Sequence, residues 1–292
     1  MKAIVIAGGK GTRLRPLTCK QPKPMVPIAG RPMIEYILAL LKQYQFTDIG
    51  MTLFYLPELI ANYFGDGREF GVNLRYFVEE TPLGTAGSVK NAEEFLDETF
   101  LVISGDALTD INLADALVFH RARRALVTIV LTKVANPLDY GVVITEEDGR
   151  IKRFLEKPGW GEVFSDTVNT GIYLIEPEVF CHYEKDKAVD FSKDLFPLLL
   201  KAGEPLYGYV AKGYWSDVGN LAQYRQANYD LLDGKLKFKP PGREIAPGVW
   251  VGEGTEVDPT CRVEAPVVLG KYVRVAQKAK LGPHTIVGDH SL

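Results

Sequence analysis

The chain opens with Met1-Lys-Ala-Ile-Val-Ile-Ala-Gly-Gly-Lys-Gly-Thr-Arg13, and the elements that follow are best understood from this segment. The run from Ala3 to Ala7 is apolar without alternation, which is typical of a strand buried on both faces of a parallel sheet. The glycines after it let the backbone turn tightly and let amide N–H groups approach an anion closely. The segment predicts a buried strand followed by a phosphate-binding loop. The glycines alone are equally typical of an ordinary turn between a strand and a helix.

Two basic residues, Arg13 and Lys23, strengthen the prediction of a phosphate site. Lys23 lies between Pro22 and Pro24, which fix φ on both sides and hold the lysine on a stiff backbone. Two better-known glycine loops are excluded. The dinucleotide fingerprint requires a glycine where Leu14 stands, and the P-loop ends in Gly-Lys-Ser/Thr.

Composition sets the class of protein. At 292 residues the length favours two domains, and 46% hydrophobic with 24% charged residues is ordinary for a globular chain. The net charge of -3 argues against a nucleic-acid surface, so any basic site must be local. Cys19, Cys181 and Cys261 lie far apart without metal-ligand spacing, which predicts no disulfide framework or zinc site and fits a reducing cytoplasm. No apolar run reaches the length of a membrane span, so we expect no membrane partner.

Segments of strand and helix character alternate through the first part of the chain. The pattern predicts helices at 31–41, 57–64, 86–95 and 113–125 and strands at 49–56, 73–78, 99–104 and 127–132. This alternation indicates βαβ units and an α/β fold with a parallel sheet, in which ligands lie at the carboxyl ends of the strands.

The pattern then changes to an antiparallel one. Residues 140–144 and 151–156 read as a hairpin joined by Glu147-Asp-Gly-Arg150, and further strands are expected at 170–175 and 206–210. A helix at 221–232 precedes a segment rich in lysine, proline and glycine. We therefore expect a first domain at 1–233, a linker at 234–248 and a second domain at 249–292.

The second domain carries an internal repeat. Aliphatic residues recur at every sixth position, and small residues follow four of them: Val251, Val257, Val263, Leu269, Val275, Leu281 and Val287, with Gly252, Gly270, Gly282 and Gly288. A period of six is typical of hexapeptide β-helices, in which three repeats form one triangular coil. The run amounts to about two coils and stops in mid-pattern. We expect that either the parent protein continues or another subunit covers the open end.

The glycine loop with Pro22-Lys-Pro24 resembles the signature of the nucleotide-sugar pyrophosphorylases, the sugar-1-phosphate nucleotidyltransferases. Within that family, Leu83-Gly-Thr-Ala-Gly87 and Phe191-Ser-Lys-Asp-Leu-Phe-Pro197 are similar to segments of mannose-1-phosphate guanylyltransferases. The resemblance extends from Met1 to about Leu232, and the repeat has its counterpart in the same family. It implies a Rossmann-like, mostly parallel sheet flanked by helices, followed by a short left-handed β-helix.

The resemblance also implies site residues. Those that would bind the nucleotide are Ala7, Gly8, Gly9, Gly11, Thr12, Arg13, Lys23, Glu80, Gly84 and Asp106. Those that would bind the sugar phosphate are Tyr140, Gly141, Glu156, Lys157 and Asn169. Asp106 and Asp217 would bind Mg²⁺, and together with Arg13 and Lys23 they form the expected catalytic set.

Other interpretations of the same residues remain open at this point. Asp106, after the apolar strand Phe100 to Ser104, is equally typical of a turn or a helix cap. Glu156 and Lys157 are typical of a solvated surface pair, and Lys193 fits a structural role. Glu80 is the expected guanine ligand, since a carboxylate accepts from N1–H and N2–H together.

The expected reaction joins a nucleoside triphosphate to a sugar 1-phosphate and releases pyrophosphate. GTP with mannose 1-phosphate is the leading pair, and glucose 1-phosphate with UTP or dTTP is the runner-up. A non-catalytic regulatory homologue that binds nucleotide sugars is an alternative of another class, although binding alone would not require the two metal-binding aspartates. A homo-oligomer assembled through the repeat is also expected.

Overall fold

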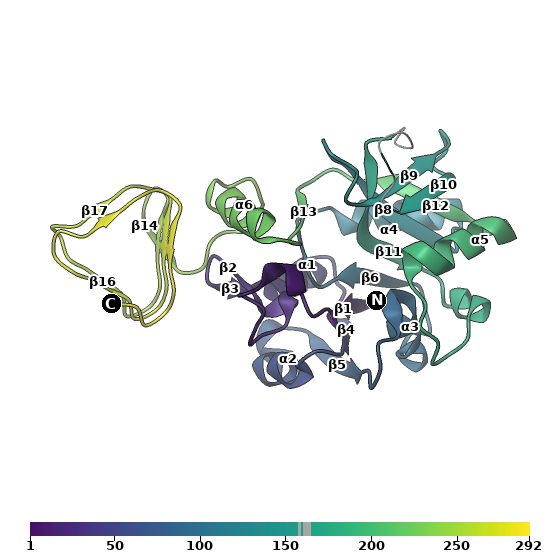
Figure 1. Ribbon diagram of the computed structural model, residues 1–292, viewed down its shortest axis with the longest axis horizontal. Helices are drawn as coiled ribbons and strands as arrows, with labels where there is room; N and C mark the ends of the chain where they lie inside the picture. Colours follow the sequence, from purple (N-terminus) through teal and green to yellow (C-terminus); the bar gives the residue numbers. More distant parts are fainter. Residues whose placement is uncertain (157–158, 160–164) are drawn as a thin grey trace.

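The computed structural model describes residues 1–156, 159 and 165–292 (Figure 1). Its described residues form a nine-stranded sheet in the order β10-β9-β11-β6-β1-β4-β5, with β8 beside β11 and β12 beside β8. The parallel centre consists of β1 (Lys2–Ile6), β4 (Asp48–Leu53), β5 (Asn73–Val78) and β6 (Phe100–Ser104). The expected order of buried strand and glycine loop is thus present at the centre of the sheet.

Beyond β6 the sheet becomes mixed. The strands on this side are β8 (Val127–Lys133), β9 (Gly141–Thr145), β10 (Ile151–Glu156), β11 (Thr167–Ile175) and β12 (Leu206–Val210). Strand β11 runs antiparallel to β6, β8 and β9, and β10 runs antiparallel to β9. The remaining strands share the direction of β1, so the prediction of a mostly parallel sheet with a hairpin beside it is confirmed.

Helices cover both faces of the sheet. They are α1 (Met33–Gln43), α2 (Pro57–Phe64), α3 (Gly84–Lys90), α4 (Leu113–Arg123), α5 (Phe196–Ala202) and α6 (Leu221–Leu232). The helix expected at 86–95 is shorter than predicted, because α3 ends at Lys90 and a separate 3₁₀ turn follows at Glu93–Phe95. The helix expected from Arg31 starts two residues later, because Arg31–Pro32 forms strand β3, which pairs with β2 (Pro27–Ile28).

The apolar side chains of β1 belong to two separate hydrophobic cores, because successive side chains of a strand point to opposite faces of the sheet. Ala3 and Val5 pack in the core that contains Ile37 of α1, while Ile4 packs in the core that contains Val89 of α3. All three β1 side chains are fully buried. A strand covered on both faces has no solvent side, which explains why its sequence shows no alternation.

The C-terminal residues form a three-sided coil, drawn as a triangle at the end of the chain in Figure 1. Its strands are β14 (Arg243–Ala246), β15 (Val249–Val251), β16 (Glu256–Val257), β17 (Arg262–Val263), β18 (Val267–Leu269), β19 (Arg274–Val275), β20 (Lys280–Leu281) and β21 (Thr285–Val287). Parallel ladders join β15 to β18, β18 to β21, β16 to β19 and β17 to β20. Val249 pairs with Val267, so one turn takes eighteen residues, or three repeats of six. The left-handed sense of the coil stays a prediction.

The coil packs on the rest of the chain through α6. Val268 and Ile286 belong to the same hydrophobic cluster as Leu231 at the end of α6. His284 Nε2 lies 2.6 Å from Asp233 Oδ1, and the His284 ring lies 4.5 Å from that of Tyr229. These contacts fix the coil against the helix that follows residues 215–217. Among the described residues, no helix has the length and apolar character needed to cross a bilayer.

Two glycines of the repeat provide a matched test of the coil. A methyl group added at Gly252 would lie 2.5 Å from the carbonyl carbon of Gly270, whereas nothing lies within 4 Å of one added at Gly282. We expect Gly252→Ala to destabilise the protein by about 1 to 3 kcal/mol, the usual cost of overpacking. Gly282→Ala should leave stability nearly unchanged. Thermal unfolding of the two variants measures the difference, and equal melting temperatures would contradict the stacking of β15 on β18.

Candidate active site

Two cavities meet at the carboxyl ends of β1 and β6. We call the first the loop cavity, and its volume is about 300 Å³. The glycine loop and the turn before α3 form much of its wall. The residues that line it include Gly8, Gly9, Phe54, Glu79, Gly84, Thr85 and Asp190. We call the second the hairpin cavity; its volume is about 220 Å³, and it is lined by Tyr140, Gly141, Glu156, Asn169, Ser192, Trp215 and Asp217. Ser104 and Asp106 line both cavities. A group transferred between two bound molecules would therefore cross beside Asp106.

A lysine joins two aspartates at this junction. Lys23 Nζ donates to Asp106 Oδ2 at 2.6 Å and lies 3.4 Å from Asp217 Oδ1. Ser104 Oγ donates to the other Asp106 oxygen, Oδ1, at 2.7 Å. Lys23 is only 6% exposed, so its charge is held in the protein interior. The expected group of Lys23, Asp106 and Asp217 is thus assembled in space.

Asp217 reaches the junction by a route that the sequence did not indicate. Asp217 does not lie at a strand end of the main sheet. Its strand β13 (Trp215–Asp217) pairs antiparallel with β7 (Ala107–Thr109) in a separate two-stranded sheet, with Asp217 opposite Ala107. Because Ala107 directly follows Asp106, this pairing places the two carboxylates side by side.

The pKa values of Asp106 and Asp217 are shifted in opposite directions. Burial alone would raise the pKa of Asp106, but the Lys23 charge and the hydrogen bonds from Lys23 and Ser104 outweigh it, so the pKa is lowered. Burial and the neighbouring Asp106 charge raise the pKa of Asp217 despite Lys23 and Arg13. Burial would lower the pKa of Lys23, but Asp106 and Asp217 together raise it. The cluster carries excess negative charge that one lysine only partly offsets.

The glycine loop is shaped around Lys23. Gly11 has φ of 62°, and a methyl group there would lie 2.8 Å from Lys23 Cβ. Thr12 begins the 3₁₀ turn Thr12–Leu14, which presents Arg13. A methyl group at Gly219 would lie 3.1 Å from Asp217 Oδ2 and 3.3 Å from Arg13 Nη2, so the arginine and the aspartate both border this glycine. Ala7 differs from the other loop residues, because its N–H donates to the carbonyl of Thr52 at 2.9 Å and belongs to the sheet.

The turn before α3 needs one correction. Glu80 is exposed and is not among the residues that line the loop cavity, whereas the adjacent Glu79 is 8% exposed and lines it. Glu79 Oε2 accepts from the Leu83 N–H at 3.0 Å. The expected guanine ligand Glu80 therefore does not line this cavity, and the preceding residue Glu79, the first after β5, does.

Gly84 serves packing as well as the cavity. Its φ is 71°, and a methyl group there would lie 2.6 Å from the carbonyl oxygen of Val189. The neighbouring Thr85 donates to Asp190 Oδ2 at 2.9 Å, and Asp190 Oδ1 accepts from the Ser192 N–H. Residues 189–192 thereby connect the wall of the loop cavity to Ser192 in the wall of the hairpin cavity.

The hairpin cavity contains most of the expected sugar-side residues. Tyr140, Gly141, Glu156 and Asn169 line it, and Lys157 lies outside the described residues. Asn169 Nδ2 donates to Tyr173 Oη at 3.0 Å and to Ser192 Oγ at 3.3 Å, while its Oδ1 accepts from the Gly171 N–H. Asn169 thus also holds the cavity wall together. Sequence reasoning missed Ser104, Ser192 and Trp215, although all three flank or fall within motifs that it had singled out.

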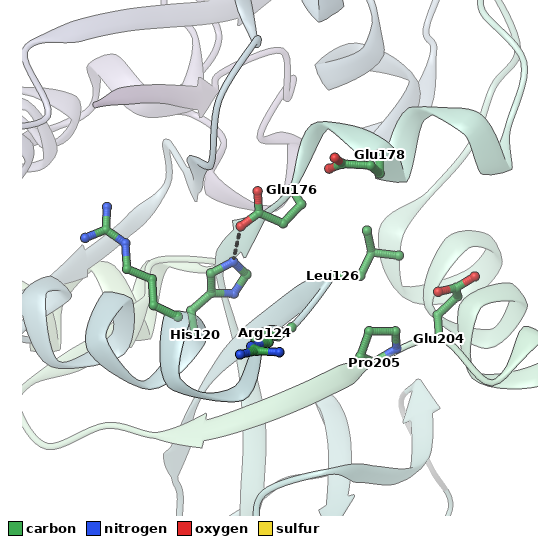
Figure 2. A pocket seen from close by; sticks show the side chains of 9 residues that line it. His120, Arg124, Leu126, Glu176, Glu178, Glu204 and Pro205 are labelled. Atoms are coloured by element: carbon green, nitrogen blue, oxygen red, sulfur yellow. Dashed lines mark hydrogen bonds and ion pairs between the residues drawn. The ribbon is translucent and has the colours of Figure 1, made fainter.

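A third cavity, of about 460 Å³, lies at the opposite ends of the strands (Figure 2). His120 is 1% exposed and points at Glu176, with its Nε2 3.0 Å from Glu176 Oε1. Its other ring nitrogen, Nδ1, lies 2.8 Å from Thr128 Oγ1. Burial lowers the pKa of His120. Since both ring nitrogens of His120 are hydrogen-bonded to other side chains of the protein, we assign this histidine a role in the fold and none in binding a ligand.

Comparison with known proteins identifies the family. The family model described as "Nucleotidyl transferase" matches residues 2–234, which include both cavities. The chain belongs to the nucleotidyl transferase family. It is therefore an enzyme of the transferase class.

The curated relatives of this nucleotidyl transferase include proteins with two different specificities. A UTP--glucose-1-phosphate uridylyltransferase of Synechocystis is 38% identical over 308 residues, covering 100% of this chain and 79% of the relative. A mannose-1-phosphate guanylyltransferase of Mycobacterium tuberculosis is 35% identical over 285 residues, covering 91% of this chain and 79% of the relative. A Bacillus anthracis protein described as a glucose-1-phosphate thymidylyltransferase, solved with sucrose, has a TM-score of 0.71 at 28% identity and covers 78% of this chain and 94% of its own.

The opposite shifts of the aspartates predict opposite effects on stability. The pKa of Asp217 is raised on folding, so its stabilising contribution is present below about pH 4, the ordinary aspartate value, and is lost as pH rises through the raised value. At pH 7 and without divalent ions, Asp217→Asn should therefore raise the melting temperature. The pKa of Asp106 is lowered, so its contribution is present above about pH 4 and is lost as pH falls through the lowered value.

Asp106→Asn should accordingly cost about 1 to 3 kcal/mol at pH 7, since it leaves a buried lysine with a weaker partner. Thermal unfolding at pH 7 and near pH 3 measures both effects, which should shrink at the lower pH. Asp139→Asn is the matched control, because Asp139 lines the same cavity but is exposed. Equal changes in melting temperature for the Asp106 and Asp217 variants at pH 7 would contradict the opposite pKa shifts of these two aspartates.

Proposed function

We propose that this nucleotidyl transferase joins a nucleoside triphosphate to a sugar 1-phosphate and releases pyrophosphate, with GTP and mannose 1-phosphate as the leading pair. The observation that carries the proposal is the junction of two cavities at Asp106, with Lys23 and Asp217 beside it. The loop cavity would take the nucleotide, and the hairpin cavity would take the sugar phosphate. The α-phosphate of the nucleotide would then lie at the junction.

The reaction needs positioning and charge stabilisation rather than a covalent enzyme intermediate. An oxygen of the sugar phosphate attacks the α-phosphorus, one P–O bond forms, and the bond to the leaving pyrophosphate breaks. Arg13 and the backbone of Gly8, Gly9 and Gly11 hold the triphosphate, and Lys23 offsets charge that gathers on the reacting phosphates. Because the leaving group departs as an anion, a fixed cation near it lowers the barrier.

The junction also fits a divalent ion. Its donor set is two carboxylates close enough to share one ammonium group, and burial together with the charge of Asp106 raises the pKa of Asp217. Among the described residues no group of three or more His, Cys, Asp or Glu side chains could hold a metal, so phosphate oxygens and water would complete the shell, as Mg²⁺ prefers. Asp106 and Asp217 would hold the ion. When bound, Mg²⁺ would neutralise charge on the phosphates.

Glu79 supports guanine as the base. Its Oε2 binds the Leu83 N–H, while its Oε1 is directed toward the glycine loop, 3.9 Å from a methyl group built on Gly8. A buried carboxylate in this place favours a base with adjacent N–H donors, and guanine presents N1–H and N2–H on one edge. Uracil presents a single N3–H. The Synechocystis relative, a uridylyltransferase, keeps UTP with glucose 1-phosphate as the second candidate.

On the sugar side, Tyr140, Glu156 and Asn169 would contact the ring and its hydroxyls, and Gly141 allows close approach. A methyl group at Gly141 would lie 2.9 Å from Glu156 Oε2, so a larger residue there would push the carboxylate aside. Lys157 would bind the sugar phosphate. The relatives are named for mannose 1-phosphate and for glucose 1-phosphate. These two sugars differ in configuration at C2, so the choice of sugar rests on which polar group of the protein faces that carbon.

Pyrophosphate release tests the proposal directly. The assay combines each of four nucleoside triphosphates with mannose 1-phosphate and glucose 1-phosphate, with and without Mg²⁺. GTP with mannose 1-phosphate should turn over fastest, and Arg13→Ala should lower turnover by about 10²- to 10³-fold while melting normally. A preference for UTP with glucose 1-phosphate would establish the second candidate. Binding without turnover of any pair would point to a non-catalytic regulatory homologue.

We also propose a division into a catalytic domain at 1–233, a linker at 234–248 and a left-handed β-helix of hexapeptide repeats at 249–292, in a protein that acts in the cytoplasm. The β-helix would join copies of the chain, because its Tyr272 is an exposed hydrophobic residue, at 51%, and so is Ile245 in the adjoining end of the linker, at 58%. Removing the residues after Gly242 should lower the mass measured by light scattering and leave turnover largely intact. An unchanged mass would contradict assembly through the repeat.

A further inference from the structure

Gln223, on the first turn of α6, lines neither cavity but contacts Tyr140 of the hairpin cavity and Gly219, two residues after Asp217. We infer that Gln223 is a positioning residue, which fixes Tyr140 so that this tyrosine donates its hydroxyl proton into the hairpin cavity, toward an oxygen of the sugar phosphate. The inference rests on the proposed function for the identity of the ligand. The orientation of Tyr140 follows from contacts within the protein alone.

The amide of Gln223 has one orientation. Its Oε1 accepts from the Gly219 N–H at 3.0 Å. A backbone N–H can only donate, so the oxygen of the amide must face Gly219 and the NH₂ group must face the other way. The helix start fixes the backbone of Gln223, because its N–H donates to the side-chain oxygen Oδ1 of the N-cap residue Asn220 at 2.9 Å.

The fixed amide determines what Tyr140 can do. Gln223 Nε2 donates to Tyr140 Oη at 3.2 Å, so the phenol oxygen is an acceptor in this bond and its proton is left for another partner. In the part of the chain that the structure describes, no acceptor takes that proton. Burial raises the pKa of Tyr140, so the hydroxyl remains protonated at neutral pH. Tyr140 is therefore a donor directed at whatever occupies the cavity.

The tyrosine ring is held as firmly as its hydroxyl. It packs edge to face on Trp215 with the ring centroids 5.3 Å apart, and Trp215 Nε1 donates to the carbonyl of Thr170 at 2.9 Å. Trp215, Thr170 and Tyr140 all line the hairpin cavity. Gln223 thus connects the backbone beside Asp217, through Gly219, to the tyrosine that faces the sugar phosphate.

Gln223→Glu tests the polarity of this bond with little change in shape. One carboxylate oxygen keeps the Gly219 N–H, while the other can only accept, so the Tyr140 proton turns away from the cavity. We expect the KM for the sugar 1-phosphate to rise about tenfold, a usual effect of losing one neutral hydrogen bond, with the KM for the nucleotide changed less than about twofold. Tyr140→Phe, which removes the same proton, should give the same pattern.

The double variant separates this effect from added charge near Asp217. If Gln223 acts through Tyr140, Gln223→Glu in the Tyr140→Phe background should raise the KM for the sugar 1-phosphate no further. Multiplied effects, or an equal rise in the KM for the nucleotide, would overturn the inference. Gln223→Leu serves as a further control, because it leaves the Tyr140 proton free to rotate and should cost less than Gln223→Glu.

A spectroscopic readout makes the test independent of activity. The Raman doublet of tyrosine distinguishes a hydroxyl that accepts a hydrogen bond from one that donates. In each background, subtracting the spectrum of the protein that also carries Tyr140→Phe isolates the signal of Tyr140. It should report an acceptor in the wild type and a donor in Gln223→Glu, and an unchanged doublet would overturn the inference. Absence of pyrophosphate release with every substrate pair, together with the expected Raman change, would contradict the proposed function alone.

Discussion

One buried ammonium group holds two carboxylates together, and the rest of the site depends on it. Lys23 Nζ lies 2.6 Å from Asp106, between β6 and β7, and 3.4 Å from Asp217, at the end of β13. Two half-buried carboxylates repel each other, and each has lost part of its solvation. The glycine at position 11, with its positive φ, allows Lys23 to approach, and the flanking prolines restrict its backbone. The glycine loop and the prolines therefore position this cation.

Hydrogen bonds around Tyr214, the residue before β13, hold Asp217 in place together with Lys23. We call this set of bonds the brace. Asp110, only 5% exposed, accepts from the Tyr214 N–H at 2.7 Å and from the Lys237 N–H at 2.9 Å. Tyr214 Oη in turn donates to Asp230 Oδ2 on α6 at 2.8 Å. A carboxylate at the end of a short strand would otherwise be free to move. The brace limits that freedom and so limits the entropy lost when a ligand orders the site.

The same region connects the junction to the C-terminal coil. Val218, Leu108 and Leu231 belong to one hydrophobic cluster with Val268 of the coil. Val218 follows Asp217 and Leu108 follows Ala107, so the cluster packs directly behind the paired strands β7 and β13. The coil therefore extends the hydrophobic cluster behind β7 and β13, and its own residues line neither cavity.

Local sequence determined the elements whose cause is local. The apolar β1, the glycine loop, helix α2 over Pro57–Phe64, the hairpin and the six-residue spacing of the coil were all readable, because burial on two faces, tight turns and stacking each leave a mark in neighbouring residues. Many of the candidate site residues followed from the resemblance of short motifs to those of a known family. Only the tertiary structure decided that Asp217 arrives on a separate two-stranded sheet, that Glu79 rather than Glu80 faces the loop cavity, and that Gln223 supports Tyr140. Each of these depends on a side-chain direction or on a contact between residues distant in sequence, and neither is encoded in the spacing of nearby residues.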